Sequence, residues 1–131
     1  MPFDPKDFLT IAKNLMGDAK YSNESAYRTC ISRAYYSAFL ICRTFLETRH
    51  GYHFGRSPYV HHQVVKGLRQ RRVLRSFRGN SYGIRFMVAD ALKDLRENGR
   101  NKADYNMIVG IGQSTAQHWI QQAEYIVSRI P

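Results

Sequence analysis

Apolar residues recur every three or four positions along most of this chain, which is the period of an amphipathic helix. The longest stripe lies between positions 23 and 49 and contains Tyr27, Cys30, Ile31, Ala34, Tyr35, Ala38, Ile41, Cys42 and Phe45. It predicts a helix of about 27 residues and roughly 40 Å that would be the spine of the fold. Runs that alternate apolar and polar residues, as strands do, are almost absent.

Shorter helices are predicted on both sides of this one, over residues 4–17, 59–72, 82–98 and 114–130. The first begins with an N-cap acid, Asp4, followed by a proline at the first helical position. The last begins at a capping-box sequence, Ser114-Thr-Ala-Gln117. A loop rich in glycine and aromatic residues is expected over 50–58, and a turn over 79–81.

Four to five helices joined by short loops imply an all-α, up-and-down bundle. The 131 residues predict one domain over the whole chain, 1–131, because this length buries one core but not two. Asn98-Gly99 is a good terminator for the fourth helix, although a helix could also continue through Gly99 at a cost of about 1 kcal/mol.

The chain carries a formal charge of +10, and nearly all of the excess lies in one region. Between Thr48 and Ala89 there is no Asp or Glu, while nine basic residues occur: Arg49, Arg56, Lys66, Arg69, Arg71, Arg72, Arg75, Arg78 and Arg85. Arginine outnumbers lysine 14 to 6 over the chain, which favours bidentate contacts to phosphate. We interpret the region as a surface for nucleic acid. The alternatives are a solvated basic face and a surface for an acidic protein.

No apolar run approaches the roughly 20 residues of a membrane helix. The start, Met1-Pro-Phe-Asp4, lacks the basic and apolar regions of a signal peptide, so we expect a cytoplasmic protein without a membrane segment. Cys30 and Cys42 lie 12 positions apart in the predicted long helix. About 18 Å then separates them, which is too far for a disulfide bond, and we expect both to be small buried side chains.

The densest group of functional side chains is Arg100-Asn-Lys-Ala-Asp104-Tyr105. Guanidinium, amide, carboxylate and phenol side chains so close together would be costly in a plain apolar core. They suit a site in which Arg100 binds a phosphate through its forked donors while Tyr105 contacts a base or ribose. The alternative is an ion-paired helix end without a ligand.

A second motif, Ser32-Arg-Ala-Tyr35-Tyr36-Ser-Ala-Phe39, lies in the predicted long helix. The helical spacing of Tyr35, Phe39 and Phe45 indicates core positions, whereas Tyr36 and Tyr105 are better placed to reach a cleft. Arg33 is either a second phosphate ligand or a buried partner of Asp94 or Asp104. We favour the pairing, because an arginine among apolar residues needs a carboxylate.

Histidines and glycines add no metal or cofactor site. Adjacent His61 and His62 cannot both point to one site, and no histidine has a recognised ligand spacing, so no metal is expected. For one of this pair we expect a packing or capping role. Gly110-Ile111-Gly112 lacks the third glycine of a dinucleotide-binding loop and any preceding strand, so no cofactor is expected.

The two polar motifs, in this order and in an all-helical chain, resemble the signatures of HEPN domains (higher eukaryotes and prokaryotes nucleotide-binding). His61 or His62, followed by Val64-Val65, also lies where many HEPN domains carry a histidine at the start of the third helix. The resemblance covers roughly residues 23–130. It implies a helical bundle that commonly dimerises, with the motif residues lining a cleft at the dimer interface.

Many HEPN proteins are metal-independent endoribonucleases, often toxins paired with a nucleotidyltransferase antitoxin. Their motif ends in a histidine, whereas Tyr105 stands at that position here, with Asp104 before it. A phenol with an ordinary pKa near 10 is a poor base at neutral pH, although it can act as an acid or orient a phosphate. The resemblance therefore leaves two functions open: a ribonuclease, and a non-catalytic module that partners a nucleotidyltransferase.

Together, the residues and the resemblance predict a homodimer with a basic cleft for RNA or a nucleotide. Arg100, with Asn101, Asp104 and Tyr105, is expected to form the catalytic or phosphate-orienting set. The residues expected to contact the nucleic acid or nucleotide are Arg33, Tyr36, Lys66, Arg69, Arg72, Arg75 and Lys102.

Overall fold

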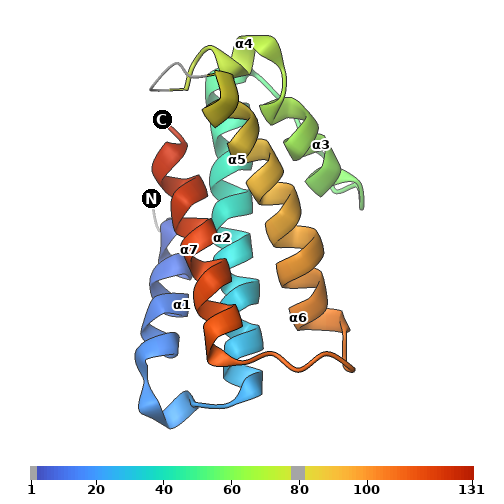
Figure 1. The fold of residues 1–131 in the computed structure, drawn as a ribbon. Helices are drawn as coiled ribbons and strands as arrows, with labels where there is room; N and C mark the ends of the chain where they lie inside the picture. Colours follow the sequence, from blue (N-terminus) through green and yellow to red (C-terminus); the bar gives the residue numbers. More distant parts are fainter. Residues whose placement is uncertain (1–2, 78–81) are drawn as a thin grey trace.

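The long helix expected from the sequence is present, and the other helices are arranged around it (Figure 1). The structure is a computed structural model and describes residues 3–77 and 82–131, so the turn expected over 79–81 lies outside the described residues. Every element in those residues is helical: α1 (Lys6–Gly17), a short turn η1 (Ala19–Tyr21), α2 (Glu24–His50), α3 (Val60–Leu68), α4 (Arg71–Leu74), α5 (Tyr82–Asp94), the π-helical η2 (Leu95–Arg100), α6 (Asn101–Tyr105) and α7 (Gln113–Arg129). The all-α prediction is confirmed.

Local signals at both ends of α2 set its length. The Asn23 side chain accepts a hydrogen bond from the backbone N–H of Ala26 (2.9 Å) and so caps the N-terminus. At the other end Gly51 has a left-handed conformation (φ 69°), and the backbone N–H of Tyr52 donates to the carbonyl of Leu46 (3.2 Å). In this arrangement a glycine ends a helix at little steric cost.

The apolar stripe of α2 forms the centre of the core. Its buried members are Cys30, Ile31, Ala34, Tyr35, Ala38, Cys42 and Phe45, while Tyr27 and Ile41 are only partly buried. α1 and α7 cover α2 on one side, and α3, η2 and α6 cover it on the other (Figure 1). Both cysteines are free and buried, as expected.

The third helix is shorter than its pattern predicts. α3 ends at Leu68 rather than near position 72, because Gln70 has an extended backbone (ψ 138°) and α4 begins after it. The break turns Val73 and Leu74 into the core, where they are 0% and 1% exposed. Burial of these two side chains therefore outweighs the continuation of the helix.

The capping box predicted at Ser114 does not form. α7 begins one residue earlier, at Gln113, and no side chain caps it. The preceding chain is already fixed, because the side chain of Ile111 is buried and its backbone N–H donates to Glu24 Oε1 (3.1 Å). The position at which the chain enters α7 is thus set by tertiary contacts.

The bundle departs from a simple up-and-down order at α3, which runs parallel to α2 (Figure 1). The first turn of α3 reaches the middle of α2 through a hydrogen bond between His61 and Tyr35. The segment after α3 reaches the end of α2, where Arg72 Nη1 donates to the carbonyl of His50 (3.0 Å). Loop 51–59 therefore carries the chain back along α2 before α3 begins.

The helix that carries the Arg100 motif passes through Gly99. α5, η2 and α6 follow one another without interruption from Tyr82 to Tyr105. η2 is a π-helix, with i→i+5 hydrogen bonds, a form that occurs in short pieces and often near functional sites. A Cβ built on Gly99 would lie 2.9 Å from Cδ2 of Trp119 in α7. The absent side chain thus allows η2 and α7 to approach closely.

We predict that Gly99→Ala destabilises the protein by about 1–2 kcal/mol, because the Cβ overpacks against the Trp119 ring. Helix propensity alone would predict a gain of about 1 kcal/mol. Urea unfolding measures the change. The matched control is Gly17→Ala in α1, whose Cβ would meet nothing within 4 Å; equal stability of the two variants would contradict the packing argument.

Candidate functional site

Arg100, the last residue of η2, is the centre of a polar cluster that joins α6 to α2. Its guanidinium donates hydrogen bonds to four side chains, those of Asp104 (2.8 Å), Asn101 (3.3 Å), Tyr36 (2.9 Å) and Tyr105 (3.1 Å). The Arg100 side chain is only 12% exposed. The structure thus brings together the four residues of the predicted catalytic set, and it adds Tyr36 from the second motif.

Asp104 holds one edge of the guanidinium. It lies four positions after Arg100, the spacing at which side chains on a helix meet, and its Oδ2 accepts from Arg100 Nε. The same oxygen accepts a hydrogen bond from Ser32 Oγ on α2 (3.3 Å). Ser32 is buried, so this carboxylate, which is itself partly exposed, connects the surface motif to the interior face of α2.

Two phenols lie against Arg100 on the side that opens to solvent. The guanidinium carbon is 5.4 Å from the ring centre of Tyr36 and 5.1 Å from that of Tyr105. Both phenol oxygens accept from the same nitrogen, Nη2, so each hydroxyl proton remains available to another acceptor. Tyr36 is half-buried and Tyr105 is 67% exposed. A ligand can therefore reach these donors from the Tyr105 side.

The surroundings of Arg100 favour its charged form. Burial acts to lower the pKa of Arg100, but Tyr36, Tyr105 and Asp104 together outweigh burial and the pKa is raised. Four of the five guanidinium N–H donors are used within the protein. An anion would therefore be held by the two phenol hydroxyls and the remaining N–H, with the positive charge behind them.

The favoured interpretation of Arg33, a pairing with Asp94 or Asp104, is wrong. Both carboxylates accept hydrogen bonds from other side chains. The Arg33 guanidinium lies 5.3 Å from the ring centre of Phe8 and 5.2 Å from that of Tyr36. Contacts with two aromatic faces take the place of the carboxylate, and Arg33 supports the Tyr36 ring.

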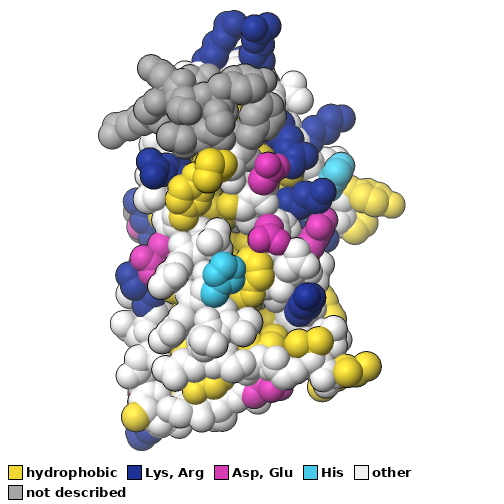
Figure 2. Space-filling view, viewed as in Figure 1, with side chains coloured by type: hydrophobic (Ala, Val, Ile, Leu, Met, Phe, Trp, Pro, Cys, Tyr) yellow, Lys and Arg dark blue, Asp and Glu magenta, His cyan; other side chains and the backbone are white. Residues whose placement is uncertain are grey.

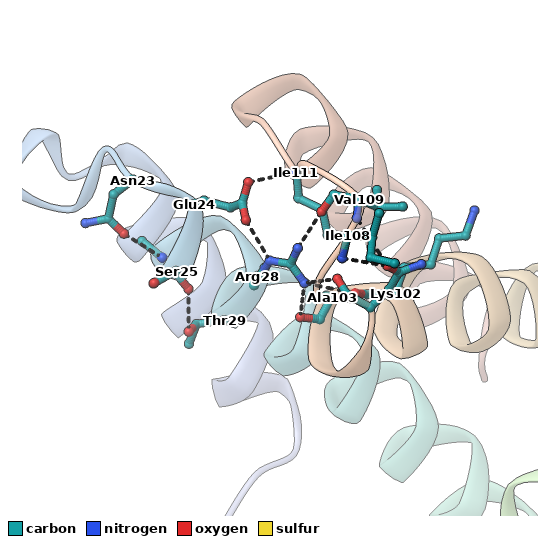
Figure 3. Close-up of polar contacts among 12 residues, drawn as sticks. Asn23, Glu24, Ser25, Arg28, Thr29, Lys102, Ala103, Ile108, Val109 and Ile111 are labelled. Atoms are coloured by element: carbon teal, nitrogen blue, oxygen red, sulfur yellow. Dashed lines mark hydrogen bonds and ion pairs between the residues drawn. The ribbon is translucent and has the colours of Figure 1, made fainter.

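A second arginine, Arg28 on α2, fixes the segment that follows Arg100 (Figure 3). Its guanidinium donates to four backbone carbonyls around the end of α6, those of Lys102 (3.0 Å), Ala103 (2.9 Å), Asn106 (2.9 Å) and Val109 (2.5 Å). A helix leaves its last carbonyls without partners, and its dipole favours a cation there. Arg28 therefore both caps α6 and ties it to α2.

Glu24 extends this connection to α7. Its Oε2 accepts from Arg28 Nε, and its Oε1 accepts from the backbone N–H of Ile111, both at 3.1 Å (Figure 3). The hydrogen bond from Ile111, and then that from Arg28, lowers the pKa of Glu24. Sequence reasoning missed both residues. Their i,i+4 spacing was visible, but the backbone acceptors of Arg28 lie 74 to 81 positions further along the chain.

Tyr35 and His61 form a pair that links α2 to α3 next to the Arg100 cluster. The Tyr35 hydroxyl is hydrogen-bonded to Nδ1 of His61, and the imidazole stacks on Phe39 with 4.2 Å between ring centres. Burial raises the pKa of Tyr35, so the phenol keeps its proton and donates it to Nδ1. This assignment leaves the imidazole proton on Nε2.

The surroundings of this imidazole disfavour its charged form. Burial first, and then the positive charges of Arg96, Arg100 and Arg43, lower the pKa of His61 to about 4. His61 is therefore neutral near pH 7 and is a weak base. It has the packing role expected for one of the two adjacent histidines.

Lys66 lies on α3 and Arg69 lies directly after its end. Both face the α5–η2 segment and line a pocket together with Arg96. Figure 2 shows Lys and Arg side chains gathered over this part of the surface, with acidic side chains among them. Asp90 accepts a hydrogen bond from Arg69 (2.6 Å). Arg96 was not among the expected contact residues, because its place beside α3 depends on tertiary packing.

Arg72 and Arg75 are not brought to the Arg100 cluster. Arg72 is hydrogen-bonded to His50 at the end of α2, whereas Arg100 is hydrogen-bonded to Tyr36. Tyr36 and His50 are 14 positions apart on α2, which is about 20 Å of helix. Arg75 follows α4 and is exposed. The basic residues expected in one cleft are therefore divided among three places: the Arg100 cluster, the pocket beside α3, and the region of α4 and the end of α2.

Lys102 is exposed on α6 and borders an open hollow of about 540 Å³ with Asn101 and Tyr105. Met107 and Ile108 in the loop after α6 line the same hollow and are 86% and 97% exposed. The Tyr105 side of the cluster is therefore bordered by one cation and by apolar side chains.

Comparisons with known proteins do not assign this site. The chain matches no protein-family model, no curated protein and no solved structure. Over residues 3–77 and 82–131, no three His, Cys, Asp or Glu side chains are placed to hold a metal ion. In the same part of the chain, no helix has both the length and the apolar character needed to cross a bilayer.

We predict that Arg28→Met destabilises the protein by about 2–4 kcal/mol, because four backbone carbonyls lose a charged donor. Urea unfolding measures the change in the free energy of unfolding. Faster hydrogen exchange at the Ile111 amide would locate the effect at the loop before α7. Arg129→Met removes an exposed arginine and is the control. The role assigned to Arg28 would be refuted if both variants had the same stability.

Acid should weaken the fold through His61. Because its pKa of about 4 in the folded protein lies below the ordinary value near 6.5, the unfolded chain takes up the proton first. The free energy of unfolding that neutral His61 contributes is present in full above about pH 6.5 and is lost as the pH falls towards 4. The loss is on the order of 1 kcal/mol once screening of the charge by solvent is taken into account.

His61→Asn tests this pH dependence, since an amide oxygen can still accept from Tyr35 but does not titrate in this range. The variant should be less stable near pH 7, where it lacks the ring that stacks on Phe39, and its stability should change less between pH 6.5 and 4. Unfolding in urea across this range measures both. His62→Asn, at the exposed neighbour, should keep the wild-type slope; an unchanged slope in His61→Asn would contradict the assignment.

Proposed function

We propose that this protein is a HEPN-like RNA- or nucleotide-binding protein that holds a phosphate group at Arg100. The observation that carries the proposal is the arrangement of Tyr36 and Tyr105 on one guanidinium nitrogen, at 2.9 and 3.1 Å. Both hydroxyls can then donate to oxygens of the same phosphate group, next to a fixed positive charge. The exposed ring of Tyr105 is free to contact a base or ribose.

The geometry favours binding over cleavage. Attack by a 2′-hydroxyl needs a group that takes its proton, and the neighbouring groups are engaged elsewhere. Asp104 is bonded to Arg100 and Ser32. His61 is bonded to Tyr35 and its pKa is about 4. The function best supported is therefore phosphate binding by a non-catalytic module.

A ribonuclease is the second candidate, and one observation favours it. The hydroxyl of Tyr105 lies against the Arg100 guanidinium, which is a suitable place for a proton donor to a leaving oxygen while Arg100 stabilises the charge on phosphorus. This candidate needs no metal ion, so cleavage should persist in a chelator.

The proposal includes a homodimer in a toxin–antitoxin or stress system, with a nucleotidyltransferase as the protein partner. Exposed Met107 and Ile108 beside the Tyr105 hollow support a second copy at this edge. Sedimentation of the purified protein as a monomer at micromolar concentration would contradict the dimer. Co-purification of this protein with the nucleotidyltransferase tests the partner. If the two proteins do not associate, the partner is removed from the proposal.

The site is tested by titration of labelled single-stranded RNA in a chelator at two salt concentrations. We expect wild-type binding to weaken with salt and Arg100→Ala to bind at least 10-fold more weakly, about 1.4 kcal/mol. Tyr105→Phe should lose about 3- to 10-fold, since it keeps the ring and removes one hydroxyl donor. Circular dichroism checks that the variants keep their helices.

Arg129→Ala is the matched control, because it removes the same charge from an exposed position on α7. Equal losses in Arg100→Ala and Arg129→Ala would reduce the effect to net charge and contradict the site. RNA cleavage by the wild type, absent in Arg100→Ala, would instead establish the ribonuclease.

A further inference from the structure

A small basic pocket lies between α3 and the α5–η2 segment, separate from the Arg100 cluster. Lys66 and Arg69 line it on one side, and Lys93, Arg96 and Glu97 line it on the other. Arg100 is not part of its wall. In the view of Figure 2, Lys and Arg side chains gather over these two elements.

The charges in this pocket are poorly balanced. Four cations face one carboxylate, that of Glu97. Arg69 has an acidic partner outside the pocket, Asp90, at 2.6 Å. Lys66, Lys93 and Arg96 form no ion pair within residues 3–77 and 82–131. Like charges held this close repel one another unless an anion lies between them.

Arg96 has the clearest need for an external acceptor. Its Nε is buried and has no hydrogen-bond partner among the described residues. Buried guanidinium donors in folded proteins are normally paired, because an unmade hydrogen bond there costs free energy. His61, whose remaining proton is on Nε2, adds a neutral side chain to the same pocket wall.

The size of the pocket limits its ligand. Its volume is about 130 Å³, below the roughly 300–1,000 Å³ of pockets that enclose drug-sized molecules. It corresponds to about four water molecules at ~30 Å³ each. The space therefore suits one small tetrahedral oxyanion, held by forked guanidinium and ammonium donors.

We propose that the pocket between α3 and η2 is a second anion site, which binds a phosphate group through Arg96, Lys66, Lys93 and Arg69. The phosphate belongs either to the end of a nucleotide or RNA chain or to an internal position of the RNA backbone. This proposal does not depend on the Arg100 site, because Arg100 does not line the pocket. It can therefore be tested with inorganic phosphate alone.

The first test is a titration of the ¹⁵N-labelled protein with inorganic phosphate at constant ionic strength. We expect saturable shifts of the amide signals of Val65, Lys66 and Glu97, and no such shifts with chloride. In Arg96→Met, which keeps a long apolar side chain without the charge, affinity should fall at least 10-fold. Lys66→Gln, at an exposed position, should weaken binding several-fold, and it serves if Arg96→Met does not fold.

Arg71→Met is the control, because Arg71 is an exposed arginine of the same basic region that does not line the pocket. It should bind phosphate like the wild type. Shifts that do not saturate, that chloride reproduces, or that are the same in the wild type, Arg96→Met and Lys66→Gln would overturn the proposal.

RNA with and without a 5′-phosphate distinguishes the two sources of the group. A terminal phosphate is indicated if its removal weakens wild-type binding at least 10-fold but leaves Arg96→Met binding unchanged. A backbone phosphate is indicated if both RNAs bind equally to the wild type and both bind at least 10-fold more weakly to Arg96→Met. Wild-type affinity of Arg96→Met for inorganic phosphate and for both RNAs would refute the site, whatever the result for Arg100→Ala.

Discussion

The position of every candidate ligand-binding side chain on η2 and α6 depends on one guanidinium, that of Arg28. α6 is only five residues long, and a helix of that length has little stability of its own. Arg28 holds its last carbonyls, and Glu24 holds the start of α7 through Ile111. Since both side chains project from the first turns of α2, this long helix sets the position of a helix of only five residues.

The elements of this fold were predictable where they depend on local patterns. The length of α2 follows from its apolar stripe, from Asn23 at its start and from Gly51 after its end. The errors fall where tertiary packing decides. Burial of Val73 and Leu74 breaks the third helix, and the hydrogen bond between Ile111 and Glu24 moves the start of α7. Helical propensity contains no information about either contact.

The candidate site, too, was predictable where it depends on local spacing and not where it depends on tertiary packing. Arg100, Asp104 and Tyr105 are close in sequence, so their grouping could be predicted from helical spacing. The contribution of Tyr36 followed from the second motif. The place of Arg96 could not be predicted, because it depends on how α3 packs against the α5–η2 segment. The parallel course of α3 brings His61 next to Tyr35, and this pair lies within the electrostatic influence of both Arg96 and Arg100.

The π-helical turn affects how the length of the chain before Arg100 can change. A π-turn contains one residue more than the α-helical turn it replaces. Deleting one residue between Leu95 and Arg100 would let an ordinary α-turn replace the π-turn with nearly the same rotation between the flanking segments, because the π-turn holds that extra residue. Deleting a residue from the α-helical part of α5 has no such outlet, and it would turn the two parts of the helix by about 100° relative to each other. If α5 kept its packing, Asp104 would then face away from Ser32, and the carbonyls of α6 would face away from Arg28. The π-turn is therefore the place along this helix where the chain can change by one residue and still keep the two polar motifs together.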